Sequence, residues 1–156
     1  MWSRSPFCFQ DHSLQIKMLS LLTTTYILFV GMALAGSPLD KLDDDTKAML
    51  NMLHETCVGQ TGVQESQIDN ARHGDFAEDD NFKAYLGCVY QQTGALGDDG
   101  VADYDTIIGM LPDVIADRGG KMISKCRHVK ESSAAATAFE LNKCLYNADP
   151  EFFFIF

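Results

Sequence analysis

Four cysteines in the second part of the chain are the residues best suited to chemistry. They are Cys57, Cys88, Cys126 and Cys144, separated by 30, 37 and 17 intervening residues. Zinc sites and thiol redox sites typically use cysteines two residues apart, and the sequence contains no Cys-X-X-Cys pair. An even number of cysteines without metal spacing predicts two structural disulfides, and the sequence alone leaves all three pairings open.

The N-terminal 35 residues look like a removable leader. The segment from Met18 to Ala35 is apolar and uncharged and ends in small residues, which is typical of a signal peptide. A single-pass anchor is the alternative, although the apolar run is barely long enough to cross a bilayer. Residues 1–17, with the odd Cys8, are either a long n-region or an artefact of translation starting before Met18. We expect residues 1–35 to be removed and residues 36–156 to be a secreted, extracellular domain, where disulfides persist.

Charge and motifs disfavour several classes of function. A net charge of −10 repels phosphate backbones and anionic lipid headgroups, so we expect no nucleic-acid partner and no membrane-surface function. No Gly-X-Ser-X-Gly motif is present, and the glycine- and aspartate-rich segment 94–100 does not match a calcium loop. We therefore expect a protein that is not an enzyme and that needs neither metal nor cofactor.

Apolar residues recur at helical intervals through residues 36–156, with no strand-like alternation. The predicted helices cover about 37–57, 63–73, 79–93, 104–111, 113–129 and 133–148. Gly119 and Gly120 predict a kink or break in the fifth, because glycine weakens helices, and Ser132 or Ser133 is the predicted N-cap of the sixth. The predicted fold class is all-α, a compact bundle of about six short helices.

The cysteine spacing and the helices together resemble the insect odorant-binding proteins of the PBP/GOBP family. That family usually has six cysteines, the second four residues before the third and the fifth nine residues before the sixth. The positions that match the first, third, fourth and sixth are Cys57, Cys88, Cys126 and Cys144. The absent second and fifth fall on Ala84 and Ala135, so the chain resembles the Minus-C type. The segments DDNFKAYLGCVYQQTG and FELNKCLYNADPEFFF match as well.

The resemblance implies both structure and function. It implies the pairings Cys57–Cys88 and Cys126–Cys144, each contributing on the order of 3 kcal/mol. It also implies a hydrophobic cavity that carries odorants, pheromones or other small volatiles, and a chemosensory membrane receptor as protein partner. We expect a monomer or weak homodimer, with a looser fold and a more adaptable cavity because the third bridge is missing.

Fifteen residues on the inner helix faces and in the tail are predicted to line that cavity. They are Met49, Leu50, Leu53, Leu86, Tyr90, Ile107, Met110, Leu111, Met122, Ile123, Ala138, Leu141, Leu145, Phe153 and Phe154. Ordinary core packing is the alternative for each, since apolar stripes usually are core. Tyr90 is the predicted polar contact to an alcohol, aldehyde or ester oxygen, unless it faces outward. The tail 152–156 is predicted to fold back as a lid or wall; a dimer contact or packing outside the first helix are the alternatives.

The expected energetics suit a carrier. A ten-carbon volatile can reach micromolar affinity, about −8 kcal/mol, because each buried methylene contributes about 0.8 kcal/mol. His54, His73 and His128 leave two interpretations open, pH-triggered release or solvated surface histidines. The alternative function is a secreted interaction or effector protein, or a lipid-storage protein, on the same scaffold, since a fold does not fix its function.

Overall fold

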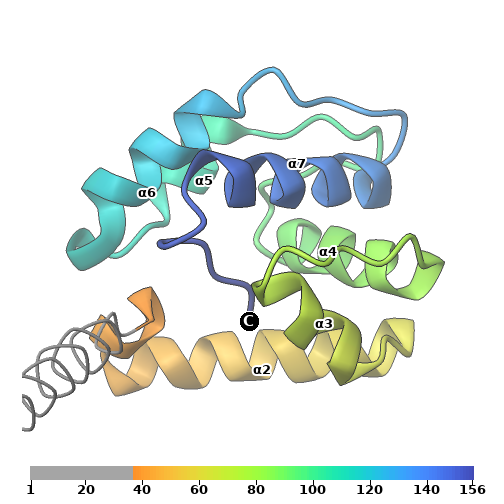
Figure 1. Ribbon diagram of the computed structural model, residues 1–156, viewed down its shortest axis with the longest axis horizontal. Helices are drawn as coiled ribbons and strands as arrows, with labels where there is room; N and C mark the ends of the chain where they lie inside the picture. The colour runs from red at the N-terminus through yellow and green to blue at the C-terminus, as the bar shows by residue number, and fades with distance from the viewer. Residues whose placement is uncertain (1–36) are drawn as a thin grey trace, which may run out of the picture. The chain divides into compact units, whose positions relative to one another are not determined.

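The computed structural model describes residues 37–156, and Figure 1 shows this part as a set of short helices joined by loops. In chain order the elements are η1 (Pro38–Lys41), α2 (Asp44–Thr61), α3 (Glu65–Arg72), α4 (Asp80–Gln92), α5 (Tyr104–Gly109), α6 (Asp113–Lys125) and α7 (Ala134–Ala148). The all-α prediction is confirmed, since residues 37–156 contain six α-helices and only one isolated β-bridge. None of the helices in this range has the length and apolar character needed to cross a membrane. The leader predicted for residues 1–35 lies outside the described residues.

Local capping explains where several helices begin and end. The Asp43 carboxylate accepts a hydrogen bond from the backbone N–H of Thr46 at 2.9 Å, so the first predicted helix divides into η1 and α2. Asp79 caps α4 in the same way, and the Ser133 hydroxyl caps α7 as predicted. Helix α2 ends at Thr61 because Gly62 adopts a left-handed conformation with φ of 68°.

The prediction of a break at Gly119 and Gly120 is wrong, because α6 runs without interruption from Asp113 to Lys125. Gly119 is buried where α6 meets other parts of the chain. A Cβ atom at this position would lie 2.9 Å from Leu111 Cδ1 and 3.5 Å from Phe152 Cε1. The glycine therefore permits a close approach rather than interrupting the helix. Helix α6 also ends four residues before the predicted end at residue 129, with Cys126 as its C-cap.

The two disulfides connect neighbouring helices in the pairings that the family resemblance implied. Cys57 of α2 bonds to Cys88 of α4, with 5.7 Å between their Cα atoms. Cys126 at the end of α6 bonds to Cys144 of α7, with 5.9 Å between their Cα atoms. These bonds link α2 to α4 and α6 to α7, so both pairings are confirmed.

Helices α4 and α7 make the most extensive packing contact in the described part of the chain. Figure 1 shows them one above the other in the middle of the molecule. Gly87 lies at this contact, where a Cβ atom would be 3.1 Å from both the Cα and the N of Ala135. The absence of a side chain at Gly87 therefore sets how closely the two helices approach.

Substitution Gly87→Ala is expected to lower the free energy of unfolding by about 1 kcal/mol. The added methyl group overpacks the α4–α7 contact, which costs more than the helix propensity gained by alanine. Urea unfolding measures the change. Gly59→Ala in α2 is the matched control, because nothing lies within 4 Å of its added Cβ, and it should be neutral or slightly stabilising. Equal effects of the two substitutions would contradict the packing role of Gly87.

Candidate functional site

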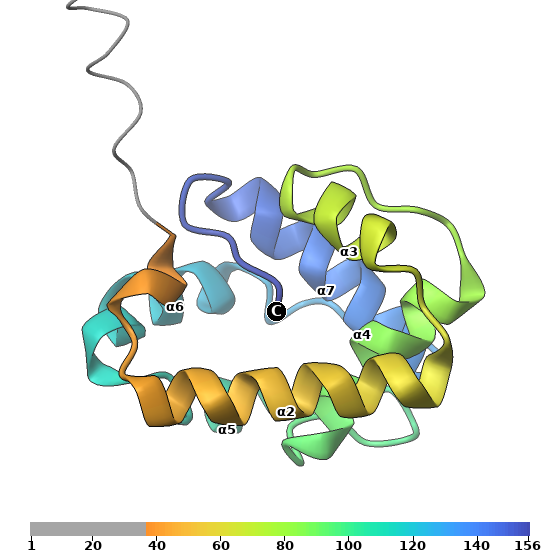
Figure 2. The same ribbon diagram turned by 90° about the horizontal axis from the view of Figure 1, so that it is seen from below.

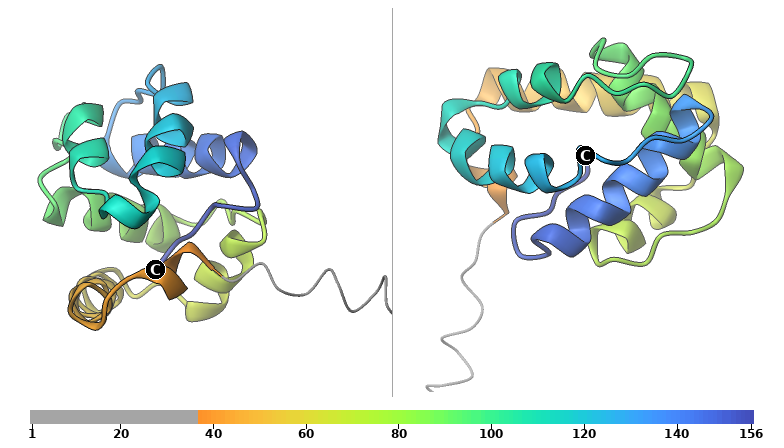
Figure 3. Two further views of the ribbon diagram at one scale, coloured as in Figure 1. Left: turned by 90° about the vertical axis from the view of Figure 1, so that its left-hand side faces the viewer. Right: turned by 90° about the horizontal axis from the view of Figure 1, so that it is seen from above.

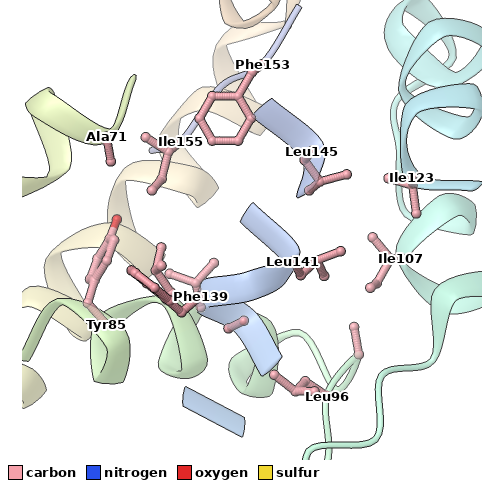
Figure 4. Close-up of a cluster of buried hydrophobic side chains, with 14 of the residues drawn as sticks. Ala71, Tyr85, Leu96, Ile107, Ile123, Phe139, Leu141, Leu145, Phe153 and Ile155 are labelled. Carbon is pink, nitrogen blue, oxygen red and sulfur yellow. The ribbon is translucent and has the colours of Figure 1, made fainter. Parts of the chain in front are cut away.

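An interior cavity of about 650 Å³ lies between the helices and the C-terminal tail. Its volume is within the range of small-molecule sites in proteins. Helices α2, α4, α5, α6 and α7 all contribute to its wall. Figure 4 shows Ile107 of α5 and Ile123 of α6 pointing toward Leu141 and Leu145 of α7. The wall thus brings together residues from distant parts of the sequence.

Twelve of the fifteen predicted residues lie on this wall. They are Met49, Leu50, Leu53, Leu86, Tyr90, Ile107, Met110, Leu111, Met122, Ile123, Leu145 and Phe154. The other three, Ala138, Leu141 and Phe153, are part of the packed core instead. Ala138 and Leu141 are fully buried in α7, and the ring of Phe153 lies 5.5 Å from that of Tyr146 in an edge-to-face contact.

Eleven further residues on the wall were not predicted, and Ile155 and Phe156 were predicted only as part of the tail 152–156. The eleven are Leu42, Thr46, Met52, Thr56, Val89, Gln92, Thr93, Pro112, Ile115, Gly119 and Asn142. Met52 and Thr56 follow Met49 at helical intervals, so the periodicity of α2 contained a signal for them. Pro112 and Gly119 carried no such signal, because their place on the wall depends on tertiary packing.

The C-terminal tail folds back into the bundle and supplies Phe154, Ile155 and Phe156 to the wall. The chain end lies between α2 and α7 in both Figure 1 and Figure 2. Arg72 Nε donates a hydrogen bond to the Ile155 carbonyl at 3.0 Å, and the Tyr85 hydroxyl donates to the backbone oxygen of Phe156. The tail is therefore held by backbone contacts as well as by apolar burial.

A salt bridge fixes the turn at which the tail leaves α7. Arg118 donates from Nε and Nη2 to the two carboxylate oxygens of Asp149, each at 2.7 Å. The Arg118 hydrogen bonds hold the pKa of Asp149 below its ordinary value of 3.8. Because that pKa is lowered in the folded state, the stabilisation is present above pH 4 and is lost only as the pH falls through the lowered value.

His54 connects the tail to α3. Its Nδ1 lies 2.9 Å from the Tyr85 hydroxyl, and its Nε2 lies 3.1 Å from Oε1 of Glu65. His54 is therefore half-buried and bonded, unlike the exposed His73 and His128. pH-triggered release, raised for all three histidines, stays a prediction.

Tyr90 and Asn142 form a polar spot on the largely apolar wall. Asn142 of α7 is only 4% exposed, and its Nδ2 donates to the Ala138 carbonyl at 2.8 Å. Burial raises the pKa of the Tyr90 phenol above its ordinary value of 10.0, so the phenol keeps its proton at physiological pH. Tyr90 lines the cavity, as predicted, and does not face outward.

A second hollow, of about 720 Å³, lies along α6. It is lined by charged side chains whose partners are other protein groups. Lys121 pairs with Asp117 at 2.9 Å, Arg118 pairs with Asp149, and Lys125 donates to the Ala148 carbonyl at 3.3 Å. The apolar cavity between the helices and the tail is therefore the better candidate for a functional site.

Comparison with known proteins gives consistent results. Residues 40–148 match the sequence profile of the PBP/GOBP family. The B1 protein of Tenebrio molitor is 33% identical over 113 residues, which is 69% of this chain and 86% of that protein. Odorant binding protein lmigOBP1 of Locusta migratoria is 30% identical with a TM-score of 0.60, covering 64% of this chain and 78% of that one.

Odorant Binding Protein 7 of Anopheles gambiae, solved with four disulfide bridges in complex with an azo compound, is also similar. It is 25% identical with a TM-score of 0.61, over 69% of this chain and 89% of that one. The family profile covers more than half of the sequence, and the solved structures share the helical fold. From its sequence and its fold, the chain belongs to the PBP/GOBP family.

Proposed function

We propose that this protein is a secreted carrier that takes up an odorant, pheromone or other small volatile molecule into its interior cavity. The observation that carries the proposal is a cavity of about 650 Å³ with a mainly apolar wall in a chain of only 156 residues. Membership of the PBP/GOBP family supports it, because odorant-binding proteins are carriers of small hydrophobic ligands rather than enzymes. Residues 1–35 would then be the leader that directs secretion.

The wall suits ligands of more than one shape. Four methionines, Met49, Met52, Met110 and Met122, contribute to it. Their thioether side chains are flexible and polarisable, so they adapt to different apolar surfaces. A ligand that replaces water against these groups gains roughly 0.8 kcal/mol per buried methylene.

The ligand can reach the cavity from solvent. Met49, Met52 and Met110 belong to the wall and yet are 63%, 69% and 46% exposed. Helix α2 packs extensively only against α4, which leaves its first half facing the cavity. In Figure 2 and in the right-hand view of Figure 3, α2 and α5 follow the same side of the molecule. Met49 and Met52 of α2 and Met110, the C-cap of α5, therefore mark an opening between these two helices.

Displacement of a fluorescent apolar probe, such as N-phenyl-1-naphthylamine, by volatile alcohols, aldehydes and esters tests the proposal. Dissociation constants in the micromolar range are expected. Leu50→Trp, which enlarges a half-buried wall residue, should weaken binding about tenfold by filling the cavity.

Val114→Trp is the matched control, because Val114 is 55% exposed and does not line the cavity. It should leave the dissociation constants unchanged. If no apolar compound displaces the probe, the carrier function is wrong and the alternative, a secreted interaction protein on the same scaffold, is favoured.

A further inference from the structure

No side chain from the described part of the chain that lines the cavity carries a charge. Within residues 37–156 the wall is built entirely from apolar side chains and the uncharged polar side chains of threonine, tyrosine, glutamine and asparagine. The lysines and arginines nearest in sequence are engaged elsewhere, for example Arg118 with Asp149. A ligand inside the cavity therefore meets dipoles and hydrocarbon, but no counter-ion from this part of the chain.

One pair of polar groups on this wall comes from two different helices. Tyr90 of α4 and Asn142 of α7 both line the cavity, and the amide of Asn142 is tied to the Ala138 carbonyl at 2.8 Å. A tyrosine hydroxyl offers one donor and two acceptor positions, so the Tyr90 hydroxyl has capacity for a ligand. Tyr90 lies on α4, the helix that packs most extensively against α7.

We propose that the Tyr90 hydroxyl on the cavity wall binds the oxygen of an uncharged head group, and that the cavity selects alcohols, aldehydes and esters over carboxylates of equal chain length. This inference rests on the proposed carrier function and assigns the ligand class of the same site. The hydroxyl can donate to a carbonyl or ether oxygen and can accept from an alcohol, so it fits all three neutral groups.

Discrimination against carboxylates follows from desolvation. A carboxylate that leaves water for a site without a cation loses its hydration and gains only hydrogen bonds in return. The protein's net charge of −10 adds a long-range repulsion of anions. The aliphatic chain contributes equally for an alcohol and an acid of the same length, so the head group alone decides between them.

Competition of 1-decanol, decanal and decanoic acid against the fluorescent probe at pH 7.5 tests the selection. Decanol and decanal should bind at least tenfold more tightly than decanoate. Between pH 7.5 and 5 the apparent affinity for decanoic acid should rise, because the neutral form becomes populated as the pH approaches the pKa of a carboxylic acid, about 4 to 5. Decanol, whose head group does not titrate in this range, is the reference, so the ratio of the decanoic acid affinity to the decanol affinity should rise. Equal binding of decanol and decanoate at pH 7.5 would overturn the proposal.

Variants separate the head-group contact from general packing. Tyr90→Phe keeps the ring and removes the hydroxyl, so it should weaken decanol about three- to tenfold while changing the affinity of the probe less than twofold. A loss shared equally by decanol and the probe would show a packing role only and would count against the hydroxyl contact.

Gln92→Lys adds a cation to the wall, and Gln91→Lys makes the same charge change on the same helix, at an exposed residue outside the wall. Decanoate should bind at least fivefold more tightly to Gln92→Lys and less than twofold more tightly to Gln91→Lys. Equal gains would show that overall charge, and not the wall, sets the preference. If none of the ten-carbon compounds displaces the probe from the unmodified protein, the carrier function itself fails, which is a separate outcome.

Discussion

Deletion of residues 151–156 is expected to weaken the binding of 1-decanol about 30-fold. The deletion removes Phe154, Ile155 and Phe156 from the wall and opens the cavity to water. Burying one large apolar side chain against a partner is worth roughly 1.5–3 kcal/mol, and a loss of about 2 kcal/mol in binding corresponds to about 30-fold in the dissociation constant. Titration calorimetry or probe displacement measures this change directly.

The deletion also removes Phe152 and Phe153, which are buried in the core. A smaller substitution is therefore needed to separate the effect of losing wall residues from the effect of losing core packing. Phe154→Ala combined with Phe156→Ala shortens two half-buried wall residues and leaves Phe153 in its aromatic contacts. The double variant should still weaken decanol about tenfold while its circular dichroism remains that of a helical protein. Glu151→Ala, at an exposed side chain, should have no effect. A folded deletion variant with unchanged affinity would rule out the tail as part of the site.

The fold was largely predictable because most of the signals that define it are local. Asp79 and Ser133 cap α4 and α7 through side chains that any reader of the sequence can identify. The glycines of α6 misled the prediction, because intrinsic propensity was overridden by packing of Gly119 against Leu111. Whether a glycine breaks a helix or allows another residue to approach it depends on neighbours that lie far away in sequence.

The site was less predictable, because helical periodicity identifies an inward face without showing whether that face meets protein or empty space. Leu141 and Leu145 lie one turn apart in α7 and are both buried, yet only Leu145 lines the cavity. Because residues four apart share a helix face, their different positions along α7, and not the side of the helix on which they lie, make this difference. The sequence did contain one signal that the prediction missed, which is Asn142 beside Leu141. A buried asparagine needs polar partners, and Asn142 finds one in the Ala138 carbonyl.

Introducing Ala84→Cys and Ala135→Cys together is expected to form a third disulfide and to raise the free energy of unfolding by about 4 kcal/mol. The two alanines occupy the positions at which the family usually has its second and fifth cysteines. Ala84 lies one turn before Gly87, at which an added Cβ atom would be 3.1 Å from the Cα of Ala135. The new bond would close a loop with a sequence separation of 51, and loop-closure entropy gives the quoted magnitude. Urea unfolding measures the gain, and a thiol count by mass spectrometry shows whether the bond forms.

The same variant tests whether the missing bridge makes the cavity adaptable. Helices α4 and α7 carry Tyr90 and Asn142 as well as apolar wall residues, so fixing their separation restricts how the wall rearranges around a ligand. The bridged protein should keep its affinity for the ligand length that fits best and should lose affinity for longer and shorter alcohols. Ala84→Cys alone, which forms no bond, controls for the substitution. An oxidised double variant that accepts the same range of alcohol lengths would show that the α4–α7 contact is already rigid and that adaptability arises from α2, α5 and their exposed methionines.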